Sequence, residues 1–293
     1  MDKVSLFLSR ISSRIQPVLN RFPILLRIKE WLKQQYFFGW RGRDTDVYLI
    51  SYPKSGRTWV RVMLGKVICE KSGISDKEVL NTYTLTKNAG GPVVQFNHDS
   101  TDAEYARPYH TLSVSRSAYR GKKVILLTRD PRDLLVSNYF QATKRDHAFQ
   151  EDLSSFVRSP RHGIKKIIRF YQNWQQVSLP DTELMHLRYE DIHQDPEKAL
   201  KNILDFMGVE VDREQTIKNA VSFASFDHMK KMEKNKYFDK KSMRPGDEKD
   251  EDSYKVRKGK VGGYDEELSW EDLDYIHRIL EEAGSPFYPE ILS

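Results

Sequence analysis

The sequence predicts an α/β fold of three layers, in which helices flank a central, mainly parallel sheet. Strand-like apolar runs bounded by turn residues alternate with segments of helical periodicity along the chain. These runs are mostly apolar throughout, as parallel strands are when both faces of the sheet are covered. With 293 residues and a hydrophobic fraction of 39%, the chain is large enough to bury such a core.

Four short runs are predicted as strands because they are rich in apolar residues and bounded by turn residues. They cover residues 46–50, 92–96, 122–128 and 182–187. Helical patterns cover residues 58–71, 131–145, 150–159, 163–178, 196–207 and 213–222. A last helix is predicted after Ser269, which has Asp272 three residues on as in a capping box, and it ends before Gly284.

The segment 227–260 breaks this alternation. It is dense in both charges and poor in aliphatic residues, so we predict a long surface loop without regular structure. Long loops inside compact domains often serve as lids or binding segments. Its basic end, "VRKGK" at 256–260, is the part that points to a ligand.

Positive charge is concentrated near the N-terminus. Residues 1–43 hold nine Lys or Arg against two acidic residues, a net charge of +7, whereas the whole chain carries +6. The remainder is therefore close to neutral, which argues against nucleic-acid binding by the body of the protein. We divide the chain into a basic amphipathic segment, 1–43, and a single domain, 44–293. The segment either contacts a membrane interface peripherally or packs on its own domain, and Pro17 and Pro23 divide it into short pieces.

The composition favours a cytoplasmic protein. Cys69 is the only cysteine, so no internal disulfide can form. No apolar stretch approaches the roughly 18 residues of a membrane span, and the N-terminus lacks the order of a cleaved signal peptide.

The first strand-like run is followed by "SYPKSGRTWVR", residues 51–61, which has the character of an anion-binding loop. Lys54 precedes the single Gly56, so the order is not that of the Walker loop, in which lysine follows the second glycine. Backbone N–H groups from Ser55 to Thr58 can nonetheless converge on an anion at the start of the next helix. Trp59 then offers a flat surface on which a purine can stack.

A second cationic segment follows the third strand-like run. In "VILLTRDPRDLLVSNYF", residues 124–140, Arg129 ends the strand, Pro131 opens a helix, and Ser137 lies two turns along it. Ligands of open parallel sheets bind outside the carboxyl ends of the strands. Cationic residues at two such ends predict two separate anionic groups on one ligand.

These segments resemble the nucleotide-binding signatures of sulfotransferases that use 3′-phosphoadenosine 5′-phosphosulfate (PAPS). The three matching segments are "YPKSGRTW", "TRDPRDLLVS" and "RKGKVGGY", and "LRYED" and "SFDHMKKM" fit between the second and third. The order and spacing agree from about residue 46 to 265. The resemblance implies a fold similar to P-loop NTPases without a Walker sequence, and PAPS as the sulfuryl donor with no metal.

The resemblance also implies roles for individual residues. The loop of Lys54, Ser55, Gly56, Arg57, Thr58 and Trp59 would hold the 5′-phosphosulfate, and Trp59 and Phe226 would stack around the adenine. Tyr189 would contact the base. Arg129 and Ser137 would bind the 3′-phosphate, over which Arg257, Lys258 and Gly259 would close.

The catalytic pair implied is Lys54, at the leaving oxygen, and His98, which follows the strand-like "GPVVQF" as the general base. Histidine ordinarily titrates near neutrality and can accept the acceptor's proton; His110 is the second candidate. The chain reads Phe96-Asn97-His98 where cytosolic relatives often read Lys-Thr-His, so an auxiliary lysine is absent there.

The acceptor is not identified by the sequence. We expect a small-molecule or lipid-like hydroxyl compound, less readily an amine, bound among aromatic residues of segments 80–115, 139–150 and 227–256. Two alternatives stay open: a small-molecule or nucleotide kinase of related fold, and a non-catalytic module that binds a nucleotide or a membrane.

Overall fold

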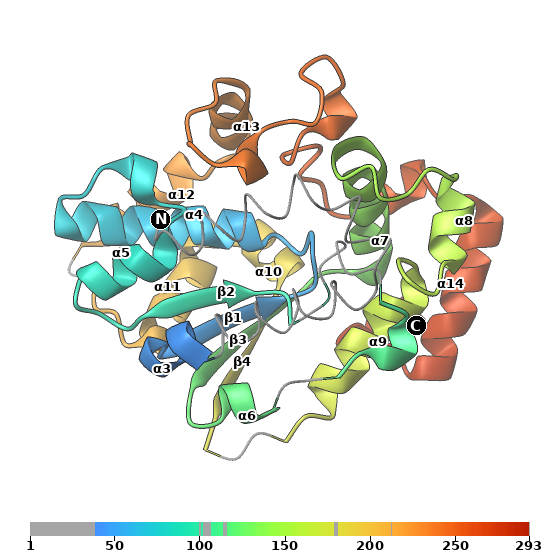
Figure 1. The fold of residues 1–293 in the computed structure, drawn as a ribbon, viewed down its shortest axis with the longest axis horizontal. Helices are drawn as coiled ribbons and strands as arrows, with labels where there is room; N and C mark the ends of the chain where they lie inside the picture. Colours follow the sequence, from blue (N-terminus) through green and yellow to red (C-terminus); the bar gives the residue numbers. More distant parts are fainter. Residues whose placement is uncertain are drawn as a thin grey trace.

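The computed structural model describes residues 39–99, 101, 107–113, 116–178, 181–211 and 213–292. Four parallel strands form one sheet in the order β2-β1-β3-β4 (Figure 1). They are β1 (Val47–Ser51), β2 (Val94–Asn97), β3 (Lys123–Thr128) and β4 (Glu183–Arg188). The predicted α/β fold with a parallel sheet is thus confirmed, and each strand lies within two residues of its predicted bounds.

Side chains of β1 alternate between two hydrophobic cores, one on each face of the sheet. Leu49 belongs to the core that also holds Phe96 of β2, while Tyr48 and Ile50 belong to the opposite core. Every residue of β1 is buried. A central strand covered on both faces explains why its sequence is apolar throughout instead of alternating with polar residues.

Helices cover both faces of the sheet (Figure 1). One face carries α4 (Arg57–Ser72), α5 (Thr82–Asn88), α11 (Pro196–Met207) and α12 (Glu214–Phe223). The other carries α7 (Pro131–Phe140), α8 (Leu153–Arg158), α9 (Ile164–Gln175) and α14 (Trp270–Ala283). Ser269 caps α14 by accepting a hydrogen bond from the backbone N–H of Asp272, as predicted.

The strand order creates a crevice between β1 and β3. After β1 the chain moves outward through α4 and α5 to β2, and after β3 it moves the other way through α7 to β4. The loops that follow β1 and β3 therefore diverge from two neighbouring strand ends. In open α/β sheets this switch point is where ligands bind.

The prediction of an unstructured loop over 227–260 is wrong in its first part. Residues Phe226–Lys234 form α13, which lies with the following segment above the sheet in Figure 1. Met229, Met232 and Glu233 are its buried residues, at helical spacing. Charged residues surround the two methionines in the sequence, which hid an amphipathic pattern.

Short elements complete the described residues. The α-helical ones are α3 (Arg41–Asp44), α6 (Arg116–Tyr119) and α10 (Tyr189–Gln194). The predicted helix 131–145 changes to a π-helical turn at Gln141–Arg145. 3₁₀ turns cover Asp76–Glu78, Tyr109–Thr111, Lys241–Met243, Glu251–Ser253, Gly263–Glu266 and Pro289–Leu292.

The basic N-terminal segment, 1–43, lies almost wholly outside the described residues, which begin at residue 39. Among the helices that the structure does describe, none combines the length and apolar character that a membrane crossing requires.

Candidate active site

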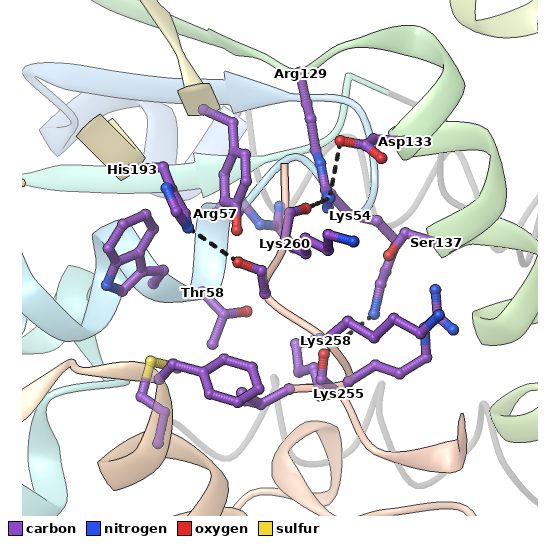
Figure 2. A pocket seen from close by; sticks show the side chains of 18 of the residues that line it. Lys54, Arg57, Thr58, Arg129, Asp133, Ser137, His193, Lys255, Lys258 and Lys260 are labelled. Atoms are coloured by element: carbon purple, nitrogen blue, oxygen red, sulfur yellow. Dashed lines mark hydrogen bonds and ion pairs between the residues drawn. The ribbon is translucent and has the colours of Figure 1, made fainter. Parts of the chain in front are cut away.

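A cavity of about 350 Å³ opens at the carboxyl ends of β1 and β3, between the start of α4 and the segment after α13 (Figure 2). All but one of the predicted site residues line it: Lys54, Gly56, Arg57, Thr58, Trp59, His98, Arg129, Ser137, Tyr189, Phe226, Arg257, Lys258 and Gly259. Ser55 is the exception, because its side chain is buried and its hydroxyl donates to the Tyr52 carbonyl at 3.0 Å.

The loop after β1 is tightly turned. Lys54 and Gly56 both have positive φ angles, of 72° and 90°. A Cβ atom on Gly56 would lie 2.5 Å from Cδ2 of Tyr189, so only glycine allows this approach. Gly56 precedes α4, and no side chain within the described residues caps that helix. The first N–H groups of α4 therefore favour an anion at the cavity floor.

Arg129, which follows β3, joins the first loop to the segment that covers the cavity. Its guanidinium donates to the carbonyl of Lys54 at 3.4 Å and to that of Lys260 at 3.0 Å (Figure 2). It stacks over the ring of Tyr189 at 4.4 Å and lies 3.7 Å from the Asp133 carboxylate. Burial raises the pKa of Asp133, and the charge of Arg129 opposes that rise.

Three side chains that the motifs did not single out hold the covering segment, residues 255–264. The Asp133 carboxylate accepts hydrogen bonds from the N–H groups of Gly262 and Tyr264, at 2.8 and 3.0 Å. Glu233 accepts from those of Lys255 and Val256, at 2.7 and 2.9 Å. His193 Nε2 lies 3.2 Å from the Gly259 carbonyl and donates to it (Figure 2). "TRDPRD" does contain Asp133, but Gly262, whose N–H donates to it, lies 129 residues further along the chain. A local sequence pattern cannot show a contact between residues so far apart.

Aromatic residues form two walls of the cavity. Trp59 and Tyr189 meet with their ring centroids 5.8 Å apart. Phe226 lies so close to Gly259 that a Cβ atom there would be 2.4 Å from the ring. Flat apolar walls beside cationic groups suit a planar base joined to phosphates.

The cations at one end of the cavity are already paired with carboxylates. Arg257 lies 3.0 Å from Glu267 and 3.3 Å from Asp252, and stacks over Phe140 at 3.9 Å. Lys258 lies 2.8 Å from Glu267 and 2.9 Å from Glu266. An anionic ligand at this end has to compete with these carboxylates.

Lys54 lines the same cavity, and within the described part of the chain its Nζ reaches only uncharged oxygens. It donates weakly to the amide oxygen of Gln141 at 3.4 Å and to the Lys255 carbonyl at 3.5 Å. Burial, then the charges of Lys255, Arg145 and Arg129, lowers the pKa of Lys54 well below its ordinary value. A nearby anion would favour the charged form and restore the ammonium.

His98 is oriented by the backbone at the end of β1. Its Nδ1 lies 2.8 Å from the carbonyl oxygen of Ser51. Because a carbonyl only accepts, Nδ1 carries the proton, and the lone pair of the neutral ring is on Nε2. This tautomer is the one that a base acting through Nε2 needs.

Comparison with known proteins identifies a family. The family model for the sulfotransferase domain matches residues 44–286. A flavonol 4′-sulfotransferase of Flaveria chlorifolia is 28% identical, over 87% of this chain and 82% of its own. A 3-alpha-hydroxysteroid sulfotransferase of Cavia porcellus is 24% identical, over 86% of this chain and 88% of its own.

Solved structures share the fold. A mouse sulfotransferase complexed with PAP (3′,5′-bisphosphoadenosine) superposes with a TM-score of 0.57, at 18% identity, over 82% of this chain and 84% of that one. A retinol dehydratase in complex with androsterone and inactive cofactor PAP superposes with a TM-score of 0.52, at 16% identity, over 82% of this chain and 81% of that one.

Proposed function

This chain belongs to the sulfotransferase family, and we propose that it transfers a sulfuryl group from PAPS to a hydroxyl group of a small-molecule or lipid-like acceptor. The observation that carries the proposal is the meeting, in one cavity, of the loop after β1, the Arg129 segment and the covering segment. Relatives whose solved complexes contain PAP, the donor after transfer, support the same donor here.

We assign the 5′-phosphosulfate to the loop from Lys54 to Trp59 and the start of α4. The 3′-phosphate is assigned to Arg129, Ser137 and the covering segment with Arg257, Lys258 and Gly259. The adenine would lie between Trp59 and Phe226, with Tyr189 at its edge. Each of these residues except Ser55 lines the cavity, and the two groups of cations match the two separate anionic groups of PAPS.

The transfer is an in-line displacement at sulfur. A bond forms between the acceptor oxygen and sulfur while the bond from sulfur to the bridging oxygen of the 5′-phosphate breaks. The electron pair of that bond stays on the phosphate oxygen, which Lys54 stabilises as charge develops there. The proton of the acceptor hydroxyl passes to Nε2 of His98.

Other features remain predictions. The relatives are named for flavonols and a hydroxysteroid, which are hydroxyl compounds, and this supports a hydroxyl acceptor here. Peripheral membrane contact through residues 1–43 and a cytoplasmic location are proposed from the sequence. A kinase is not favoured, because the loop after β1 lacks the Walker order and matches a sulfotransferase model.

The test is calorimetric titration with 3′,5′-bisphosphoadenosine (PAP), with 5′-AMP and ATP as controls. We expect micromolar binding of PAP that is lost when the 3′-phosphate is removed. Equal or tighter binding of ATP would contradict the donor assignment and revive the kinase alternative. Tight PAP binding without sulfuryl transfer to any of a panel of hydroxyl acceptors would support the non-catalytic module.

A further inference from the structure

Positive charge is unevenly compensated along the cavity. At the end assigned to the 3′-phosphate, Arg257 and Lys258 each lie within 3.0 Å of a carboxylate oxygen. By contrast, Lys54 and Lys255 of the same cavity, and Arg61 one turn along α4 from the lining residue Arg57, have no carboxylate at ion-pair distance among the described residues. A buried cation without a counter-charge is costly unless a ligand supplies one.

Lys255 is held in place by its backbone, while its side chain stays without a partner in the described structure. Its N–H donates to Glu233 and its carbonyl accepts from Lys54. Glu233 is itself engaged by the guanidinium of Arg145, 3.2 Å away, so its charge is shared and only partly offsets that of the Lys255 ammonium. Burial, together with the charges of Arg145 and Arg57, lowers the pKa of Lys255 to about 8.

Arg61 lies one turn along α4 from Arg57, outside the lining of the donor cavity. Its guanidinium stacks over the ring of Phe96 at 4.4 Å, and Phe96 precedes His98 by two residues. Nε of Arg61 is buried without a hydrogen-bond partner within the described residues. Burial lowers the pKa of Arg61 to about 9, with the charges of Arg57 and Arg41 acting in the same direction.

These cations exceed what the donor requires at this end. The phosphosulfate group carries two negative charges; Lys54 and Lys255, which line the donor cavity, offer two positive ones, and Arg61, outside that lining, offers a third. The start of α4 adds further partial positive charge. Arg61 is the cation on the side of His98, because it stacks over Phe96, two residues before that histidine.

We propose that Lys255 and Arg61 form an anion-binding subsite beside His98, and that the acceptor carries a carboxylate, phosphate or sulfate group there in addition to its hydroxyl. This inference rests on the proposed function, because it places the acceptor relative to the proposed base. Arg61 binds the anion in the plane of its guanidinium fork, and Lys255 bridges the anion and the transferred group.

The test compares two probes that differ by one carboxylate group. 6-Hydroxy-2-naphthoate and 2-naphthol share one ring system and one hydroxyl, and each is titrated by calorimetry at pH 7 into the protein saturated with PAP. We expect the carboxylate to bind at least tenfold more tightly. Its binding at pH 8 should also take up protons, measured in buffers of different ionisation enthalpy, whereas binding of 2-naphthol should not.

Variants then assign the preference to the two cations. Lys255→Gln and Arg61→Gln should each lower the ratio of the two affinities several-fold, and the double variant should bring it close to one. Lys255→Arg and Arg61→Lys should keep most of the preference. Lys201→Gln, which removes one exposed charge on α11, is the control for net charge.

Equal or weaker binding of the carboxylate, or no detectable binding of either probe, overturns the subsite. So does a loss of PAP affinity in the variants with an unchanged ratio, because the cations then serve the donor. If the unaltered protein fails to bind PAP, the proposed function fails and the subsite falls with it. If PAP binds and the carboxylate has no advantage, only the subsite fails.

Discussion

The guanidinium of Arg257 lies 3.0 Å from the carboxylate of Glu267, so a cation assigned to the 3′-phosphate is engaged before any ligand binds. Glu267 also lies 2.8 Å from Lys258. The carboxylate therefore competes with the phosphate for two of its proposed ligands, and donor binding has to break or share both pairs.

Replacing Glu267 by Gln should consequently tighten PAP binding by about threefold, since a partly exposed ion pair of this kind is worth up to about 1 kcal/mol. Binding of 5′-AMP, which lacks the 3′-phosphate, should not change. The measurement is calorimetric titration of both nucleotides, with Glu281→Gln on α14 as the control. Weaker PAP binding by Glu267→Gln would mean that the carboxylate positions Arg257 instead of competing for it.

Lys54 is predicted to act on the transfer step. Among the residues that the structure describes, its Nζ has only uncharged oxygens as partners, which leaves the ammonium available to the developing charge on the leaving oxygen. Lys54→Ala should lower kcat by on the order of 10² or more, by analogy with the loss of one oxyanion donor. Single-turnover kinetics with PAPS and any acceptor that is turned over measures this, with Lys201→Ala for comparison. A loss confined to KM would assign Lys54 to binding alone.

Gly56 is predicted to be required by close packing and not only by its backbone conformation. Gly56 and Gly208 both have positive φ angles, of 90° and 77°, so alanine at either should cost about 1 kcal/mol of stability. A Cβ atom at Gly208 meets nothing within 4 Å, whereas at Gly56 it lies 2.5 Å from the ring of Tyr189. Gly56→Ala alone should therefore weaken PAP binding, by tenfold or more in calorimetry. Equal PAP affinity in the two variants would show that Tyr189 moves aside freely.

How far the sequence predicts this protein depends on whether a feature is local. The apolar strands and the loop at Lys54 are each formed by contiguous residues, so their patterns can be recognised in the sequence. The structure brings the three signature segments together in one cavity. α13 was missed because Met229 and Met232 stand among charged residues. The role of Glu233 was missed because its partner Arg145 lies 88 residues away, and only the fold brings them together.

The lowered pKa of Lys255 predicts how the stability of the folded protein depends on pH. Its pKa is lowered from 10.5 to about 8 in the folded chain, so between these values the unfolded chain binds a proton that the folded chain does not. Stability of the ligand-free protein gains from this group as pH rises through that window. The charged groups coupled to it are Arg145, Arg57, Glu233 and Arg61.

Lys255→Met should therefore be more stable than the unaltered protein below pH 8, and the difference should shrink toward pH 10.5. Urea unfolding of both proteins across pH 7 to 10 measures that difference. Lys255→Arg keeps its charge over the whole range, so the same narrowing should not be seen between Lys255→Arg and Lys255→Met. A difference that does not vary with pH would show that Lys255 is well solvated in the folded chain.

His98 is predicted to remove the acceptor proton, because the Ser51 carbonyl fixes its Nδ1–H and leaves the lone pair on Nε2. His98→Ala should leave PAP affinity unchanged and lower kcat by about 10² or more for acceptors whose hydroxyl group is weakly acidic. The loss should shrink along a series of increasingly acidic phenols, since these need less help in losing the proton. His193→Ala is the matched control: His193 donates to the Gly259 carbonyl, so its loss should weaken PAP binding without changing the dependence of rate on phenol acidity. If the His98 variant loses the same factor for every phenol, the histidine positions the acceptor and another group takes the proton.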